Sequence, residues 1–142
     1  MKFIASLLFL LSGIAISIPT APDAAGEPVS EHVTVVPIDS DGVQRLTMVL
    51  DSYSYEPHHV VVQAGRPVEF VLTSVTTFTP HNFVLKDDAS GLSIDRDVGA
   101  GKQVILQFTP MQRGSFTFYC DKKLLFFASH REKGMEGKLE VR

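Results

Sequence analysis

The sequence predicts an all-β fold, an antiparallel β-sandwich of about eight strands. Short runs rich in Val, Phe, Thr, Leu and Ile follow one another from His32 onward, and Gly, Pro, Asp and Asn separate them. No long segment has a convincing helical pattern. Because a sheet must bury its apolar face against another layer, many short strands without helices favour two packed sheets.

The expected strands follow the turn signals along the chain. HVTVVPI and VQRLTMVLD flank the turn sequence DSDG, HHVVVQAG ends at a glycine, and PVEFVLTSV follows directly. Apolar and polar residues alternate in VEFVLTSV and SFTFYC, which indicates that each has one face in the core. The one weak helical candidate lies within 121–135, DKKLLFFASHREKGM. The eight expected strands are residues 32–38, 43–51, 58–65, 67–75, 81–86, 103–108, 115–120 and 137–141.

Length and composition indicate one globular domain. The chain has 142 residues, of which 44% are hydrophobic and 20% charged, so it can form one core but hardly two ordinary domains. Its net charge is −3, and its basic residues are scattered among acidic ones. A nucleic-acid-binding protein normally has a basic excess on one face, so no nucleic-acid partner is expected.

The first residues have the pattern of an export signal. Lys2 supplies a positive start, and Phe3 to Ile18 form an apolar run that is shorter than the roughly 20 residues of a membrane-spanning helix. We therefore predict a signal peptide over 1–19, a flexible lead-in over 20–31 and one ordered domain over 32–142. The mature protein is then periplasmic or otherwise exported and has no membrane span. Retention of the first segment as an uncleaved anchor is the alternative.

The chain contains a single cysteine, Cys120, at the end of the run SFTFYC. Cysteines usually pair in an oxidising compartment, and one cysteine cannot pair within its own chain. Cys120 is therefore an intermolecular link, a protected core thiol or a functional thiolate. His130 and Met135 follow it within fifteen positions, and His81 lies in the loop sequence TTFTPHNF. One thiolate, two imidazoles and a thioether form the ligand set of a type 1 copper site.

Each of these ligand types suits a metal that cycles between Cu(I) and Cu(II). The soft thiolate bonds strongly to both oxidation states, and its covalency gives a route for the electron. Imidazole suits both states as well. A thioether binds weakly and raises the potential because it disfavours the harder Cu(II).

At these residues the sequence resembles the cupredoxin family, which includes plastocyanin and azurin. HNF at 81–83 is similar to the family's first-ligand motif, and GSFTFYC at 114–120 to the strand that leads into the cysteine. HREKGM at 130–135 has a His-x4-Met spacing found in several members, and YSYEPHHVVVQAGRPVEFVLTSV resembles a strand-turn-strand stretch of the family. The resemblance covers essentially 43–142 and implies a Greek-key, cupredoxin-like sandwich that holds one type 1 copper ion.

The resemblance also implies roles for individual residues. His81, Cys120 and His130 are the expected equatorial ligands, and Met135 is the expected axial ligand. Asn82 resembles the residue that ties the two ligand loops together, with its backbone N–H directed at the cysteine sulfur.

The segment between the cysteine and the second histidine departs from the family pattern. Nine residues, Asp121 to Ser129, separate Cys120 from His130, which makes this loop longer than in familiar members. Its middle, LLFF at 124–127, is apolar, and its start is basic. Electrons in the family usually leave through the exposed edge of the second histidine, within an apolar patch. LLFF is expected to pack in the core or loop, to extend such a patch, or to cover His130 as a lid.

The leading hypothesis is an exported mononuclear copper protein that carries one electron at a time to or from a redox partner protein. We expect it to be a monomer and not an enzyme. The alternative is a copper-handling protein that uses the same ligands to sequester the ion or deliver it to a copper-dependent enzyme. The chain has four Met and five His without a tract. Because detoxification proteins often carry Met- or His-rich tails, this composition favours electron transfer.

Other interpretations stay open at this point. A thiol enzyme would use a Cys-His pair as nucleophile and base, but the chain has no motif for an oriented base or an oxyanion site. A metal-free sandwich module would leave the four ligand types unexplained. Zinc accepts Cys and His, although a thioether is a poor zinc ligand. His58 and His59 begin a strand and point to opposite faces, so we expect surface or edge histidines there.

Overall fold

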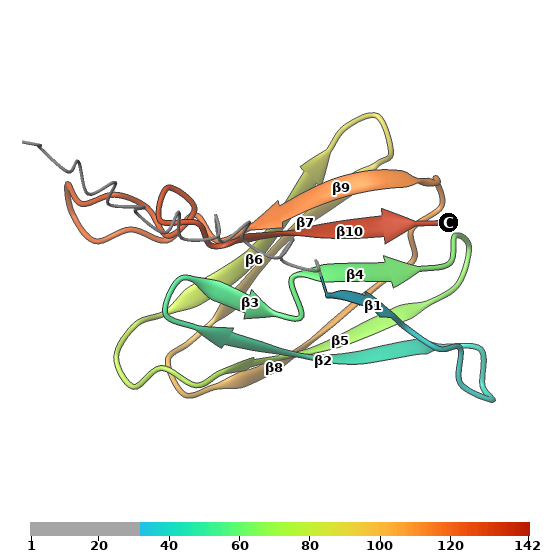
Figure 1. Ribbon diagram of the computed structural model, residues 1–142, viewed down its shortest axis with the longest axis horizontal. Helices are drawn as coiled ribbons and strands as arrows, with labels where there is room; N and C mark the ends of the chain where they lie inside the picture. Colours follow the sequence, from blue (N-terminus) through green and yellow to red (C-terminus); the bar gives the residue numbers. More distant parts are fainter. Residues whose placement is uncertain (1–31) are drawn as a thin grey trace, which may run out of the picture.

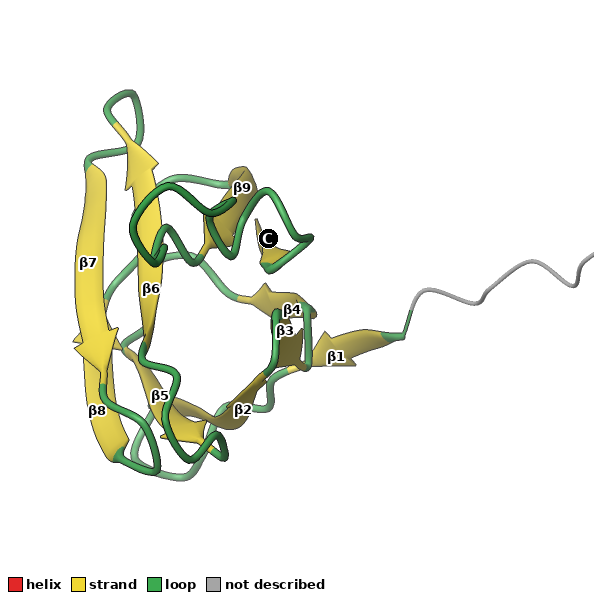
Figure 2. Ribbon diagram, turned by 90° about the vertical axis from the view of Figure 1, so that its left-hand side faces the viewer, coloured by secondary structure: helices red, strands yellow, loops and turns green. Residues whose placement is uncertain are grey.

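The computed structural model describes residues 32–142, so the predicted signal peptide (1–19) and lead-in (20–31) lie outside the described residues. The described part of the chain has ten β-strands and no helix, arranged as two sheets that face each other (Figure 1, Figure 2). It therefore offers no helix that could cross a membrane. The strands are β1 (Val33–Val35), β2 (Gln44–Asp51), β3 (Ser54–Glu56), β4 (His59–Val62), β5 (Val68–Ser74), β6 (His81–Asp87), β7 (Leu92–Val98), β8 (Gln103–Phe108), β9 (Gly114–Tyr119) and β10 (Glu136–Val141).

The two sheets confirm the predicted β-sandwich and correct its expected strand directions. Six strands pair in the order β1-β4-β10-β9-β6-β7, and four pair in the order β3-β2-β5-β8. Five strand pairs are antiparallel, as predicted. The prediction is wrong for β1 with β4, β4 with β10, and β2 with β5, which are parallel. These neighbours are joined by connections longer than a hairpin, and such connections allow parallel pairing.

Three local predictions also change. The eight expected strands omit β3, which has three residues, and β7, which reads LSIDRDV. Strand β7 lies at an edge of its sheet, so its charged side chains can meet solvent, and its sequence lacks the apolar signal of an inner strand. The weak helical candidate at 121–135 is wrong, because this segment forms turns with positive φ angles at Leu125 and Gly134.

Aromatic rings anchor the core directly beneath one end of the sandwich. The Phe83 and Phe118 rings stack with centroids 4.8 Å apart, and Tyr55 meets Phe118 edge-on at 5.1 Å. All three side chains are almost fully buried. Because side chains alternate along a strand, His81 lies on the same face of its strand as Phe83, and Cys120 on the same face as Phe118. The alternation therefore turns both residues towards the core.

Strand directions bring three distant parts of the chain to the same end of this sheet. Strands β10, β9 and β6 are neighbours, and both pairings are antiparallel. His81 begins β6, Cys120 follows β9, and Met135 precedes β10. All three positions therefore lie at the left-hand end in Figure 1, together with the long 121–135 segment.

Candidate metal centre

The structure brings His81, Cys120 and His130 together in one buried cluster. One ligand atom from each residue lies within 4.8 Å of the others. The Cys120 sulfur is 3.3 Å from Nδ1 of His130, and the two imidazole centroids are 5.1 Å apart. His81 and Cys120 are fully buried, while His130 is 7% exposed. A single metal ion fits a cluster of this size and composition.

Met135 lies at the same end of the core and is fully buried. Its backbone N–H donates to the carbonyl oxygen of His130 at 2.9 Å, and its carbonyl oxygen accepts from the Cys120 N–H at 3.1 Å. The backbone of Met135 therefore connects two residues of the cluster.

Asn82 ties the two ligand segments to each other. Its backbone N–H donates to the Cys120 sulfur at 3.4 Å. Its side-chain nitrogen donates to the carboxylates of Asp121 at 2.9 Å and Asp95 at 3.2 Å, and its side-chain oxygen accepts from the Asp121 N–H at 3.1 Å. The Tyr55 hydroxyl donates to the Asn82 carbonyl at 2.6 Å, which fixes the backbone of Asn82 to the core. The role expected for Asn82 is confirmed.

Thr76 orients the first histidine, and no sequence pattern indicated this contact. The Thr76 hydroxyl lies 2.6 Å from the carbonyl oxygen of Thr79, to which it donates its proton. It can then only accept from Nε2 of His81, 3.3 Å away, so that Nε2 carries the hydrogen. The lone pair of His81 is left on Nδ1, which is buried and has no hydrogen-bond partner among the described residues. A bound metal ion would satisfy this atom, which supports the fit of the site.

Burial keeps both imidazoles of the cluster neutral. It lowers the pKa of His81 from 6.5 to about 4; the neighbouring His130 acts in the same direction, and Asp51 opposes the shift. Burial also lowers the pKa of His130, with a smaller contribution from Lys133. Neutral imidazole is the form that binds a metal ion, so the two histidines need to lose no proton to bind one at neutral pH.

The thiol of Cys120 is protected rather than reactive. Burial raises its pKa, and the backbone N–H groups of Asn82 and Lys122 oppose the rise. A fully buried thiol with a raised pKa is a poor nucleophile, which weighs against a thiol enzyme. Because the thiolate is the metal-binding form, metal binding would release this proton.

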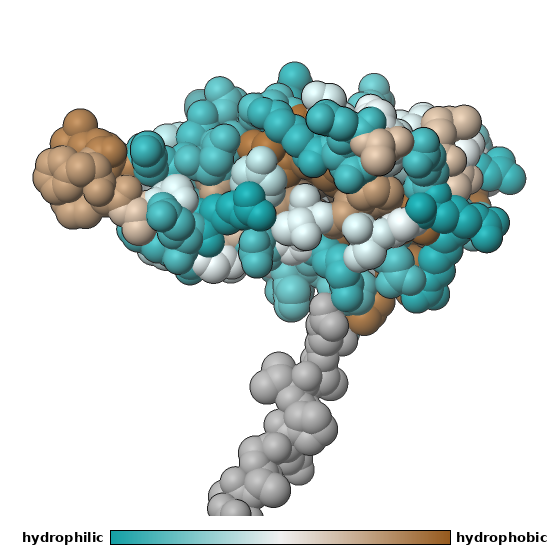
Figure 3. All heavy atoms as spheres, turned by 90° about the horizontal axis from the view of Figure 1, so that it is seen from above, coloured by the Kyte–Doolittle hydropathy of each residue, from teal (hydrophilic) through white to brown (hydrophobic). Residues whose placement is uncertain are grey.

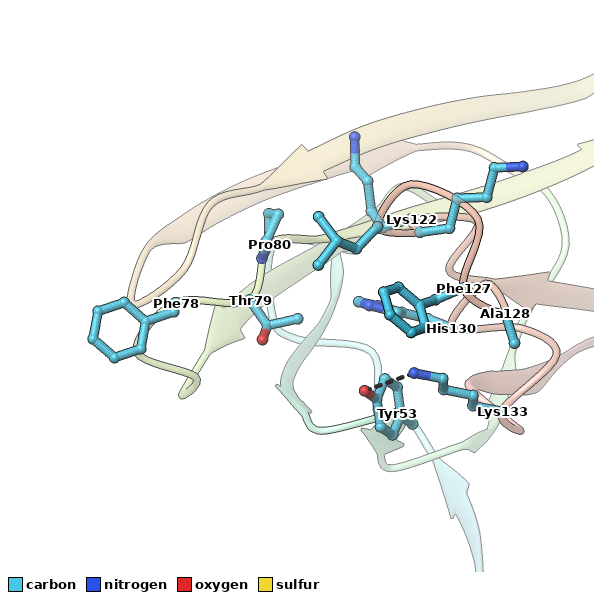
Figure 4. Close-up of a pocket in the computed structure, with 11 residues that line it drawn as sticks. Tyr53, Phe78, Thr79, Pro80, Lys122, Phe127, Ala128, His130 and Lys133 are labelled. Carbon is cyan, nitrogen blue, oxygen red and sulfur yellow. Dashed lines mark hydrogen bonds between the residues drawn. The ribbon is translucent and has the colours of Figure 1, made fainter.

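A cavity of about 480 Å³ lies beside His130, the most exposed residue of the cluster. Tyr53 meets the His130 ring edge-on at 5.1 Å, and Lys133 donates to the Tyr53 hydroxyl at 3.0 Å (Figure 4). Solvent therefore approaches the cluster from the His130 side. The cavity is lined by Tyr53, Phe78, Thr79, Pro80, Lys122, Lys123, Leu124, Phe127, Ala128, His130 and Lys133.

The LLFF sequence at 124–127 combines features of two expected alternatives, a lid beside His130 and an exposed apolar patch. Leu124 and Phe127 line the cavity beside His130, as a lid would. All four residues are nevertheless more than half exposed, so the expectation of core packing is wrong.

The other two candidate histidines lie apart from the cluster. His58 is exposed, as expected. The expectation is wrong for His59, which is only 4% exposed and has Nε2 3.4 Å from a carboxylate oxygen of Glu140. Neither residue belongs to the metal-binding cluster.

Fold and site together define a small β-sandwich protein with one buried His-Cys-His metal-binding cluster. A model of the cupredoxin-like domain matches residues 8–139, and the chain belongs to that family. This confirms the resemblance found in the sequence. Copper is the metal that the family binds, and the cluster of His81, Cys120 and His130 can hold one ion. No curated protein matches the chain.

Solved structures of the same fold include a domain of a copper-exporting ATPase, an auracyanin and a copper-containing nitrite reductase. The metal-binding domain of the Cu(I)-exporting ATPase CopA from Streptococcus pneumoniae D39 is 18% identical, with a TM-score of 0.61, over 79% of this chain and 97% of that one. Reduced auracyanin from Roseiflexus castenholzii is 18% identical, with a TM-score of 0.55, over 69% and 96%. A copper-containing nitrite reductase from Thermus scotoductus is 20% identical, with a TM-score of 0.54, over 79% and 28%. At these identities the likeness establishes the fold.

Proposed function

We propose that this protein is an exported one-electron carrier that binds a single copper ion through His81, Cys120, His130 and Met135. The observation that carries the proposal is the buried His-Cys-His cluster, in which Nδ1 of His81 has no hydrogen-bond partner among the described residues. Bound copper supplies a one-electron Cu(I)/Cu(II) couple. The chain itself would supply buried ligands, of which His81 and Cys120 are fully buried.

Rigidity of the ligand segments supports electron transfer. Asn82 holds Asp121 through side-chain hydrogen bonds and directs its backbone N–H at the Cys120 sulfur. Thr76 holds His81 through a hydrogen bond to Nε2. Contacts of this kind orient metal ligands and tune their basicity. Ligands that move little between oxidation states suit rapid electron exchange.

Met135 would be the fourth and weakest of the proposed ligands because of its position. It is fully buried, and its backbone is hydrogen-bonded to both Cys120 and His130. A thioether at this place would interact weakly with copper, so it would stabilise Cu(II) less than an oxygen ligand does but more than a side chain without a ligand atom. Replacement by leucine should leave copper bound and raise the reduction potential.

His130 is proposed as the point where electrons enter and leave. It is the least buried member of the cluster, with 7% of its surface exposed, and lies beside the cavity shown in Figure 4. A redox partner protein that covers this cavity would come closest to the metal. We propose a carrier rather than an enzyme, and the chain matches only part of the nitrite reductase.

A specific observation also supports a second candidate, the handling of copper for delivery or tolerance. The chain has the fold of the CopA metal-binding domain and matches nearly all of it. Delivery requires an ion that exchanges, whereas His81 and Cys120 are fully buried. Burial therefore favours the electron carrier.

The test measures electron exchange and copper exchange on the same loaded protein. An electron carrier should be reduced by ascorbate and reoxidised by ferricyanide over repeated cycles while it retains copper. It should lose Cu(I) to excess bathocuproine disulfonate much more slowly than it exchanges electrons. Rapid loss of Cu(I) without reversible oxidation would overturn the carrier in favour of copper handling.

A further inference from the structure

The middle of the segment between Cys120 and His130 projects from the protein as an apolar tip. The side chains of Leu124, Leu125 and Phe126 are 68%, 73% and 87% exposed, and that of Phe127 is 53% exposed. Figure 3 shows a hydrophobic knob at one end of a surface that is mostly polar. So many adjacent large apolar side chains on a protein surface mark an interaction site.

The apolar tip forms a hydrogen-bonded turn. The Phe127 N–H donates to the Leu124 carbonyl oxygen at 3.0 Å, and Leu125 between them has a positive φ of 50°. Leu124 and Phe127 face the cavity at the base of the turn, whereas Leu125 and Phe126 do not line it. The turn therefore directs its two most exposed side chains away from the metal cluster. Its internal hydrogen bond also satisfies backbone groups that an apolar medium could not.

Basic residues flank the apolar tip. The segment 121–133 has four basic residues and two acidic ones, Asp121 and Glu132, in a chain whose net charge is −3. Lys122 pairs with Asp97 at 2.6 Å, which offsets part of this charge. Lys123 directly precedes the tip and is exposed. The four basic residues, which we call the basic flank, are Lys122, Lys123, Arg131 and Lys133.

We propose that the apolar tip docks this protein on an anionic lipid bilayer, with the basic flank at the headgroups. The ring of Phe126 in the apolar tip is 87% exposed. A fluid bilayer can surround such a convex tip on all sides, whereas a protein surface would contact only one side of it. The basic flank complements the negative charge of such a bilayer. Apolar side chains insert to the boundary between headgroups and acyl chains while cations stay at the surface.

A second apolar projection lies at the same end of the molecule. Phe78, on the loop between β5 and β6, is 90% exposed. Phe78 lines the cavity that this loop shares with the long segment, and Figure 4 shows its ring at the outer edge of the residues drawn. Two apolar projections on separate loops give the bilayer two points of contact. Docking through them would hold His130 and its cavity close to the membrane surface.

This proposal goes beyond electron transfer and does not depend on bound copper, so the metal-free full chain can test it. The chain has no tryptophan, and Phe126→Trp therefore creates a single fluorescent probe in the tip. Met111→Trp is the matched control, because Met111 is 71% exposed and precedes β9, at the opposite end from Cys120. All variants share the apolar run at 3–18, so differences between them report on the tip.

The experiment adds vesicles of phosphatidylcholine with phosphatidylglycerol, with and without bromine on the acyl chains. The Phe126→Trp emission should shift to the blue and be quenched by bromine near the carbonyl end of the chains, because interfacial elements insert about 5–10 Å. The Met111→Trp emission should not change. Lys123→Gln should lower the affinity of Phe126→Trp for these vesicles about fivefold, and Arg113→Gln, which changes an exposed basic residue next to β9, should not.

Three results would overturn the proposal or a part of it. If the emission of Phe126→Trp, like that of Met111→Trp, is the same with and without vesicles, the tip does not insert. A blue shift that depends on protein concentration and not on vesicles assigns the tip to a second copy of the chain. Equal affinity for vesicles of pure phosphatidylcholine removes the role given to the basic flank.

Discussion

The segment from Cys120 to His130 has buried ends and an exposed middle, and the two parts differ in which side chains they bury. Cys120 and His130 are buried at its ends, and both are hydrogen-bonded to the backbone of Met135. Between them, the apolar tip places four large hydrophobic side chains in solvent. Residue type therefore does not decide which part is buried, because the polar histidine lies inside and the phenylalanines lie outside. The buried ends belong to the cluster that can hold a metal ion, and the exposed middle is free to meet the bilayer proposed above.

The largest difference in unfolding free energy is expected between a variant of a buried phenylalanine and a variant of an exposed one. Phe118→Ala removes a fully buried ring beneath Cys120 and should lower the free energy of unfolding by about 3–5 kcal/mol. Phe126→Ala changes a ring in the tip that is 87% exposed and should alter it by no more than about 0.5 kcal/mol. Urea denaturation of the metal-free variants measures both values. A cost above about 2 kcal/mol for Phe126→Ala would show that the tip contributes to the core.

A smaller loss of unfolding free energy is expected when the hydrogen bonds that hold the start of the segment, at Asp121, are removed. Asn82→Ala removes three side-chain hydrogen bonds to Asp121 and Asp95 and should cost about 2–3 kcal/mol. Amide hydrogen exchange at Asp121 should accelerate as well. Gln103→Ala is the control, because it removes one exposed hydrogen bond to Thr73. If the two variants were equally stable, Asn82 would not hold the segment in place.

The sequence predicted the buried ends of the segment better than its middle. Short motifs such as HNF and GSFTFYC place His81 and Cys120 beside strands, and the alternation of side chains turns them inward. The exposure of LLFF could not be predicted from the sequence, because hydrophobic residues usually favour burial. The turn projects because the buried residues at the two ends of the segment fix where it begins and ends. The contact from Thr76 to His81 was missed because a loop threonine has no distinctive pattern. Parallel pairing of β2 with β5 joins strands distant in sequence, which local patterns do not reveal.

Removal of the contact from Thr76 should weaken metal binding without large unfolding. Thr76→Val loses the acceptor for Nε2 of His81, so the imidazole is less firmly oriented. Loss of such a supporting contact typically lowers metal affinity about 10- to 100-fold. Competition with a copper chelator measures the affinity, and Thr76→Ser, which keeps the hydroxyl, should restore it. Equal affinity of the valine variant and the unchanged protein would remove the role given to Thr76.

Acid should destabilise the metal-free protein through its buried imidazoles. Burial lowers the pKa of His81 to about 4 in the folded chain, whereas the unfolded chain has the ordinary value of 6.5. The unfolded state therefore binds more protons between these values. Stability should be complete above about pH 6.5 and fall towards pH 4, by at most about 1.4 kcal/mol per pH unit for this residue.

Denaturation of two histidine variants over this pH range tests the effect. His81→Gln should reduce the slope, whereas His58→Gln should not, because His58 is exposed. The lowered pKa of His130 acts in the same direction and should leave part of the slope in place. An unchanged slope in His81→Gln would contradict the burial of a neutral imidazole at this position.

Copper binding through Cys120 is best tested by a titration with Cu(II), followed by visible absorption and EPR spectroscopy. A copper site built on Cys120 should give an intense thiolate-to-copper band that reaches its limit at one copper per chain, disappears with ascorbate and returns on oxidation. Cys120→Ser should lack this band. Stoichiometric binding without the band, or the same band in Cys120→Ser, would contradict a copper site built on Cys120.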